Sequence, residues 1–187
     1  MKSLAYRNNE AAILAGNPPE KYTRLLPYIT GNKIVEAGSA EGVLACLLAK
    51  GGASVTAIEG NAERHAQAIK LAQAWGVGPV TFINGHLQDN FAALDGQDTF
   101  VAVRMVYYLR DQIDDVFTEI AKRVLTVVLC GNKGRAKAYH AGNPHPPLGE
   151  FNYYASAEGM TDLLTRHGYQ IVQTVTDGDA IVVGKRG

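Results

Sequence analysis

Residues 33–50, KIVEAGSAEGVLACLLAK, decide the fold. The β-branched run Lys33–Ala37 predicts a strand, and small residues lead from it into the apolar stretch Gly42–Lys50, which predicts a helix. Gly51 and Gly52 follow at once and supply the left-handed conformation that ends a helix. A strand, a glycine-rich turn and a helix in this order are typical of the start of an α/β sheet.

The rest of the chain repeats this alternation of strands and helices. The helix predicted over 111–124 is the clearest, because its apolar residues recur at the helical period and form one stripe. Crossovers of this length require a mostly parallel sheet with helices on both faces, which is a doubly wound α/β fold. The Asp-Gly pair within Thr176–Asp179 predicts a hairpin between the last two strands, which are then antiparallel. The predicted strands are 33–37, 54–59, 79–84, 99–104, 126–130, 169–175 and 180–185, and the further helices are 61–75 and 156–167.

Length and composition predict one domain, 1–187, that begins with a helical cap over 1–30. Of the 187 residues, 47% are hydrophobic and 19% are charged, as in ordinary globular proteins. The 18 Lys and Arg residues balance 18 Asp and Glu residues, which disfavours a nucleic-acid partner. The N-terminus lacks the apolar core of a secretory signal, and no apolar run is long enough to span a bilayer. We therefore expect a cytoplasmic protein without a membrane partner.

The turn after the first strand and the end of the second strand predict an adenosine site. The turn Glu36–Gly42 has two glycines and an alanine at every second position, so a ligand can approach its backbone closely. Glu59 ends the second strand about twenty residues after Gly38, where a carboxylate can accept hydrogen bonds from ribose hydroxyls. The alternative interpretation is a glycine-rich turn beside a solvated glutamate.

The acidic residues of this turn discriminate between adenosine ligands. A dinucleotide site has the pattern G-x-G-x-x-G and avoids carboxylates beside the pyrophosphate. This turn has the pattern G-x-A-x-G, with Glu36 before it and Glu41 inside it. Two carboxylates favour a ligand that is cationic near its amino-acid end, and S-adenosylmethionine carries both a sulfonium and an ammonium group.

The same residues resemble a known family. Glu36–Gly42 looks like the E/D-x-G-x-G-x-G loop of the Rossmann-like, class I S-adenosylmethionine-dependent methyltransferases, with Ala40 in place of the middle glycine. The resemblance covers roughly 33–131, and it implies a seven-stranded sheet of order 3-2-1-4-5-7-6 with the seventh strand antiparallel. The cofactor site that it implies consists of Glu36, Gly38, Ser39, Ala40, Gly42, Glu59, His86, Leu87 and Arg104.

Two positions of this site have more than one interpretation. His86 stands where the family often has an aspartate that binds the adenine amino group, and the amide of Leu87 or the side chains of Gln88 and Asp89 are alternatives. Arg104 closes the fourth strand, where it can bind the methionine carboxylate, bind an anionic substrate or pair with a carboxylate of a helix.

The segment 131–154 is predicted to be a loop that contacts substrate, because it has no periodicity and contains a proline-rich run. His140 and His145 are candidate bases for a hydroxyl near neutral pH. The candidate substrate-binding residues are Tyr107, Arg135, Tyr153 and Tyr154, with core packing or loop surface as the alternative for each. No metal site is expected, because Asp111 and Asn132 are the only nearby candidate ligands.

We therefore predict an enzyme, a methyltransferase that uses S-adenosylmethionine to methylate a hydroxyl of a small metabolite or saccharide-like acceptor. Amine methylation is disfavoured because no Asn/Asp-Pro-Pro-aromatic turn follows the fourth strand. Two alternatives stay open. One is a non-catalytic S-adenosylmethionine-binding module that acts through a protein partner, and the other is a nicotinamide dehydrogenase, which Glu36 and Glu41 disfavour.

Overall fold

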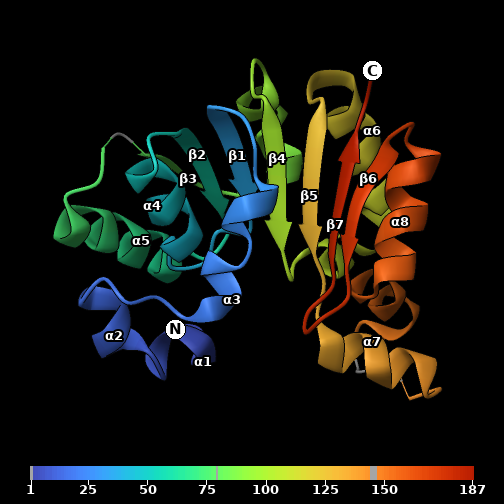
Figure 1. The fold of residues 1–187 in the computed structure, drawn as a ribbon, viewed down its shortest axis with the longest axis horizontal. Helices are drawn as coiled ribbons and strands as arrows, with labels where there is room; N and C mark the ends of the chain where they lie inside the picture. The colour runs from blue at the N-terminus through green and yellow to red at the C-terminus, as the bar shows by residue number, and fades with distance from the viewer. Residues whose placement is uncertain (1, 79, 144–146) are drawn as a thin grey trace. The chain divides into compact units, whose positions relative to one another are not determined.

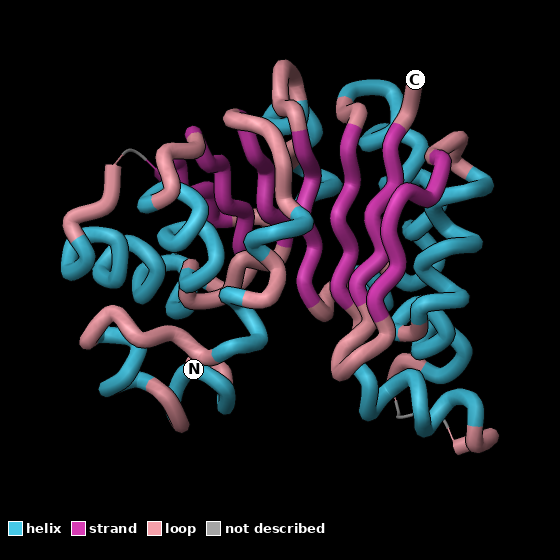
Figure 2. Tube along the Cα trace, viewed as in Figure 1, coloured by secondary structure: helices cyan, strands magenta, loops and turns pink. Residues whose placement is uncertain are grey.

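Strands and helices alternate along the chain in the computed structural model, which describes residues 2–78, 80–143 and 147–187 (Figures 1 and 2). The strands are β1 (Lys33–Ala37), β2 (Ser54–Glu59), β3 (Val80–Asn84), β4 (Thr99–Val103), β5 (Thr126–Cys130), β6 (Gln170–Val175) and β7 (Ile181–Lys185). They form a seven-stranded sheet of order β3-β2-β1-β4-β5-β7-β6. β7 runs antiparallel to both β5 and β6. The predicted α/β fold, strand order and final antiparallel strand are confirmed.

The chain divides into two compact units, Met1–Ala93 and Leu94–Gly187. In the first unit β1, β2 and β3 are parallel, and the register pairs Glu36 with Ala57 and Glu59 with Asn84. The helix α4 (Val43–Lys50) packs on β2, and α5 (Ala62–Trp75) packs on β3. Asn61 caps α5 by accepting a hydrogen bond from the Arg64 amide, so the predicted start of this helix is confirmed.

Short helices form the N-terminal part of the first unit. They are α1 (Leu4–Arg7), α2 (Glu10–Leu14), α3 (Glu20–Thr23) and the 3₁₀ turn η1 (Leu26–Tyr28). Tyr6 and Ile13 bury their side chains against Val43, Cys46 and Leu71. The segment predicted as a helical cap over 1–30 thus contains short helices, and Tyr6 and Ile13 pack two of them on α4 and α5.

The second unit contains β4 to β7 with the helices α6 (Ile113–Arg123), α7 (Lys133–His140) and α8 (Ala157–Arg166). The apolar stripe predicted for α6 is confirmed, since Val116, Phe117 and Ile120 are buried. The Phe117 ring meets Phe100 of β4 edge to face at 6.3 Å between centroids. β4 and β5 point toward the same end of this unit, and α7 lies at that end (Figure 1). Among the described residues, no helix has both the length and the apolar character needed to cross a bilayer.

The segment 131–154 was predicted to be a loop, and this is wrong over much of its length. It contains α7 and the 3₁₀ helix η6 (Gly149–Ala155). Asn132 caps α7 by accepting a hydrogen bond from the Arg135 amide at 3.2 Å. None of the residues of α7, all of which the structure describes, is buried, so the helix shows no apolar stripe in the sequence.

A substitution of Gly42, at the start of α4, tests how closely this helix approaches α5. The φ of Gly42 is +73°, and a Cβ atom there would lie 2.7 Å from the Ala68 Cβ. Gly76 also has a positive φ, +58°, but in the described part of the chain no atom lies within 4 Å of the same position. We expect Gly42→Ala to lower the free energy of unfolding by about 3 kcal/mol and Gly76→Ala by about 1 kcal/mol, because only the first adds a clash to the backbone strain. Urea denaturation measures both, and equal losses would contradict this packing.

Candidate functional site

The turn between β1 and α4 has a left-handed backbone at every second residue. The φ angles are +70° at Gly38, +50° at Ala40 and +73° at Gly42. The amides of Gly38 and Ser39 both donate to the Ile58 carbonyl, at 2.9 and 3.1 Å, and so fasten the turn to β2. This geometry explains the small residue at every second position. Ala40 adopts it at a cost of about 1 kcal/mol relative to glycine.

Glu59 joins this turn to the end of β2. Its carboxylate is buried and accepts one hydrogen bond at each oxygen, from the Ala40 amide to Oε2 and from the Asn61 amide to Oε1, both at 2.8 Å. A carboxylate oxygen can accept more than one hydrogen bond, so these two contacts leave acceptor capacity on Glu59. The structure therefore brings Glu59 and Ala40 together at the carboxyl ends of β1 and β2.

Glu36 and Ser39 have buried polar atoms that the chain does not satisfy. Glu36 is 3% exposed and Ser39 is 5% exposed. Among the described residues, Glu36 Oε2 and Ser39 Oγ have no hydrogen-bond partner. The pKa of Glu36 is raised to about 8, mainly by burial; a hydrogen bond with the Ala45 backbone opposes this shift and the charge of Glu59 adds to it. Buried polar atoms of this kind are normally satisfied, so their presence in one turn makes this turn a candidate site for a polar ligand.

Glu41 has a different role from the one that the sequence indicated. Its carboxylate is buried and accepts hydrogen bonds from the Ser3 amide and, at 2.7 Å, from the Ser3 hydroxyl. Arg64 Nε lies 4.0 Å from the same carboxylate. Glu41 therefore anchors the N-terminal segment, and the acidic character of the ligand-facing side rests on Glu36 and Glu59.

His86 and Leu87 follow β3 at the same end of the first unit. The His86 imidazole lies beside Gly60, the residue after Glu59, because a Cβ atom on Gly60 would be 2.8 Å from His86 Cε1. His86 is exposed and Leu87 is buried. Asn90 was not singled out from the sequence, and its Nδ2 holds this turn by donating to the His86 carbonyl at 2.7 Å. His86 therefore lies close to the end of β2, and the contact of His86 or Leu87 with an adenine stays a prediction.

Arg104, in the second unit, is paired with a carboxylate of the chain. Its φ is +54°, and its Nε donates to Asp179 Oδ2 at 2.7 Å. Asp179 comes from the turn between β6 and β7, and its Oδ1 accepts the Lys133 amide at 2.8 Å. Of the alternatives for Arg104, the structure shows an ion pair, with a turn carboxylate rather than a helix carboxylate. Asp179 was missed because only the hairpin geometry brings it to the end of β4.

Tyr107 and Arg135, two of the predicted substrate residues, are in contact. The Arg135 guanidinium lies 5.1 Å from the centroid of the Tyr107 ring and 5.6 Å from that of Tyr108. Its Nη1 donates to Asn152 Oδ1 at 3.1 Å, and its Nη2 donates to the Tyr108 hydroxyl at 3.3 Å. Tyr107 is buried, and this burial raises its pKa to about 12. The sequence did not single out Asn152, which has no motif and is recognised only by its contact.

The other predicted substrate and catalytic residues that the structure describes, Tyr153, Tyr154 and His140, contact groups other than Arg135. The Tyr153 hydroxyl donates to Asp162, and the Tyr154 hydroxyl accepts from Arg166 Nη2 at 3.0 Å, so both face α8. His140 is exposed at the end of α7, with its ring 5.5 Å from Tyr139. His145 lies outside the described residues. Within the described ranges, no group of three or more His, Cys, Asp or Glu residues is arranged to hold a metal ion.

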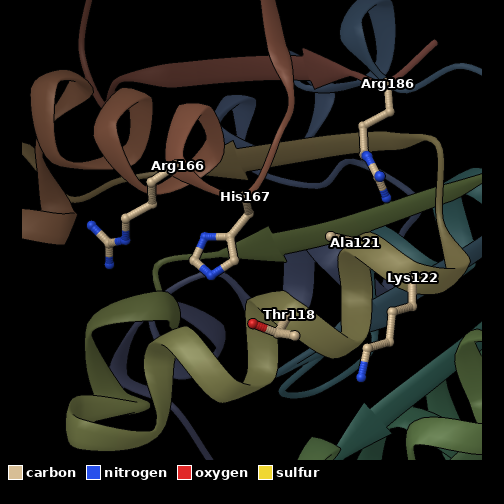
Figure 3. Close-up of a pocket in the computed structure, with 6 residues that line it drawn as sticks. All are labelled: Thr118, Ala121, Lys122, Arg166, His167 and Arg186. Atoms are coloured by element: carbon tan, nitrogen blue, oxygen red, sulfur yellow. The ribbon is translucent and has the colours of Figure 1, made fainter.

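A surface hollow of about 340 Å³ lies elsewhere in the second unit, between α6 and the end of α8 (Figure 3). Its lining residues are Thr118, Ala121, Lys122, Arg166, His167 and Arg186. Lys122 pairs with Glu119 at 2.6 Å, and Arg166 pairs with Asp114 at 2.7 Å. Figure 3 shows Arg166 and Lys122 on opposite sides of the labelled group. Both cations are thus paired with carboxylates of the chain, and the hollow contains none of the predicted site residues.

Solved structures with the same fold include two that carry an S-adenosyl ligand. The N-terminal domain of EvdMO1 with S-adenosylhomocysteine bound is 16% identical, with 90% of this chain and 82% of that chain covered and a TM-score of 0.64. Magnesium protoporphyrin IX methyltransferase from Synechocystis PCC 6803 with bound S-adenosylmethionine is 18% identical, with 98% and 81% covered and a TM-score of 0.62. A structure from a study of disulfide-to-thioacetal conversion in echinomycin biosynthesis is 18% identical, with 96% and 92% covered and a TM-score of 0.68.

No family sequence profile and no curated protein sequence matches this chain. The likeness to the solved structures is therefore one of fold, at a sequence identity below a fifth. The chain has the class I methyltransferase fold, as the sequence predicted.

The buried carboxyl of Glu36 predicts a pH-dependent stability. Its pKa is 4.5 when exposed and about 8 in the folded protein, so between these values the folded state holds a proton that the unfolded state has lost. The free energy of unfolding must therefore fall as pH rises from 4.5 toward 8. Glu36→Gln removes this dependence, so its stability relative to the unsubstituted protein should increase with pH across this window, by on the order of a few kcal/mol.

Urea denaturation at several pH values measures the difference, and the exposed Glu20→Gln is the matched control. A difference between Glu36→Gln and the unsubstituted protein that does not change with pH would contradict the buried, protonated state of Glu36.

Proposed function

We propose that this protein is an S-adenosylmethionine-dependent methyltransferase that methylates a hydroxyl of a small metabolite or saccharide-like acceptor. One observation carries the proposal. The turn after β1 holds two buried polar atoms, Glu36 Oε2 and Ser39 Oγ, that have no hydrogen-bond partner in the described part of the chain, and the carboxylate of Glu59 lies beside this turn. Neighbours with the same fold hold S-adenosylmethionine or S-adenosylhomocysteine.

The residues of the first unit fit the charges of this cofactor. Glu36 offers a buried carboxyl for the ammonium group, and Ser39 offers its hydroxyl. Glu59 has acceptor capacity for the ribose hydroxyls, and His86 and Leu87 lie at the end of β3 for the adenine. When bound, S-adenosylmethionine supplies an electrophilic methyl group. Gly38, Ala40 and Gly42 keep the turn free of large side chains, so that the ligand can approach the backbone amides.

The residues proposed to bind the acceptor all belong to the second unit. Methyl transfer needs an acceptor held in line with the reacting carbon and, for a hydroxyl, removal of a proton. Tyr107 and Arg135 form a preorganised pair for positioning. His140 and His145, the second of which lies outside the described residues, are the proposed bases, because an imidazole is the most frequent general base in enzymes. Tyr153 and Tyr154 are proposed as aromatic walls.

The names of two structural neighbours mention small molecules, which supports a small-molecule acceptor for this protein. The EvdMO1 domain has also been solved in the presence of S-adenosylhomocysteine and D-fucose, whereas the Synechocystis enzyme is named for magnesium protoporphyrin IX. Different acceptors thus occur on one fold. The direct test is transfer of a labelled methyl group from S-adenosylmethionine to a panel of hydroxylated sugars, phenols and hydroxy acids. Transfer to a hydroxyl supports the proposal, and cofactor binding without any transfer favours the non-catalytic module.

Glu59 gives the proposal a sharp mutational test. We expect Glu59→Ala to weaken the affinity for S-adenosylhomocysteine by roughly ten- to a hundredfold, because charge-assisted hydrogen bonds to the ribose are lost. Glu59→Gln keeps the shape of the side chain and should weaken binding less. Isothermal titration measures both affinities, with Glu20→Ala as a surface control and circular dichroism as a check of folding. Unchanged affinity in a folded Glu59→Ala protein would refute the ribose assignment.

A further inference from the structure

The helix α7 carries a surplus of positive charge. Lys133, Arg135 and Lys137 lie on it, and the sequence 133–140 contains no acidic residue. The carboxylate that contacts its first residue is Asp179, which accepts the Lys133 amide and already pairs with Arg104. α7, with its three cations, lies at the end of the unit toward which β4 and β5 point (Figure 1). In parallel sheets this is the end at which ligands bind.

Arg135 differs from its neighbours on α7 because it is held in place. Asn152 Oδ1 accepts from Nη1, the Tyr108 hydroxyl accepts from Nη2, and the Tyr107 ring lies under the guanidinium. All three are neutral groups. An arginine fixed by neutral partners keeps its full charge and its remaining N–H donors, arranged as a rigid fork that matches carboxylate or phosphate oxygens.

Three other arginines of the second unit pair with carboxylates. Arg104 pairs with Asp179, Arg123 pairs with Glu119 and Asp95, and Arg166 pairs with Asp114. Arg186 resembles Arg135 in lying against an aromatic ring, that of Tyr169 at 5.8 Å. No carboxylate lies within salt-bridge distance of Arg135 in the ranges 2–78, 80–143 and 147–187. Tyr108, against which its guanidinium lies, is 55% exposed, so this position is open to a ligand.

We propose that Arg135 is the anion-binding group of the acceptor site, so that the acceptor carries a carboxylate or a phosphate in addition to the hydroxyl that is methylated. This inference rests on the proposed function, because it assigns the acceptor of that reaction. Arg135 binds the anionic oxygens through its free N–H donors, while Asn152 and Tyr108 fix its orientation. The contact with Tyr107 holds the cation in one place, which reduces the entropy lost when the anion binds.

The test uses benzoate and inorganic phosphate as separate probes, each titrated into the full chain at constant ionic strength and followed by nuclear magnetic resonance. We expect saturable binding of at least one anion, and Arg135→Gln should weaken it by about tenfold or more. Lys137→Gln removes the same charge from the same helix without a fixed guanidinium, and it should weaken binding by less than about twofold. Tighter binding of benzoate identifies a carboxylate acceptor, and tighter binding of phosphate identifies a phosphorylated one.

Arg135→Lys keeps the charge but loses the fork, and an intermediate loss supports the proposal even if Arg135→Gln unfolds. Equal weakening by Arg135→Gln and Lys137→Gln, or no saturable binding of either anion, overturns it. So does a tenfold loss of S-adenosylhomocysteine affinity in folded Arg135→Gln, because Arg135 would then bind the cofactor. Titration of the unsubstituted protein with S-adenosylhomocysteine tests the proposed function separately, since anion binding at Arg135 does not depend on it.

Discussion

The hydrogen bond from the Ala40 amide to the Glu59 carboxylate is the interaction on which the candidate site depends. It joins the turn after β1 to the end of β2, and the Gly38 and Ser39 amides strengthen this link by donating to Ile58. The turn makes these contacts with a left-handed backbone at Gly38, Ala40 and Gly42. None of these three residues has a side chain larger than a methyl group, so backbone amides, the Ser39 hydroxyl and carboxyl groups are the groups that the turn offers to a ligand.

The same turn contains a buried carboxyl group, Glu36, whose burial is unfavourable for folding. Glu36 is buried close enough to Glu59 for the charge of one to oppose ionisation of the other, and its Oε2 has no partner in the described part of the chain. A buried carboxyl in this state destabilises the folded protein above its normal pKa. A cationic ligand would relieve both the repulsion and the missing hydrogen bond. This argument connects the stability of the protein to the proposed cofactor, because the ligand supplies the charge that the turn lacks.

Much of the fold could be predicted from the sequence, since hydrophobic periodicity and glycine stops mark β1, α5 and α6 clearly. The small residues at every second position of the Glu36–Gly42 turn could be recognised because they are close together in the sequence, whereas its role in binding a ligand stays a prediction. What could not be predicted depends on contacts between distant residues. α7 has no buried residue and therefore no hydrophobic periodicity in the sequence. The Glu41 carboxylate accepts a hydrogen bond from Ser3, which is distant in the sequence. Arg104 forms an ion pair with Asp179, which lies in the turn between β6 and β7. Asn152 likewise acquires its role only when η6 packs beside α7.

The most direct measurement is isothermal titration of the purified protein with S-adenosylhomocysteine, followed by S-adenosylmethionine and then NADH. The account predicts micromolar binding of the first two ligands and no binding of NADH, because Glu36 and Glu59 favour a cationic amino-acid group and oppose a pyrophosphate. Binding of NADH alone would contradict the account and indicate a dinucleotide site. Failure of all three ligands to bind a folded sample would also contradict it, and the class I methyltransferase fold would then serve another function.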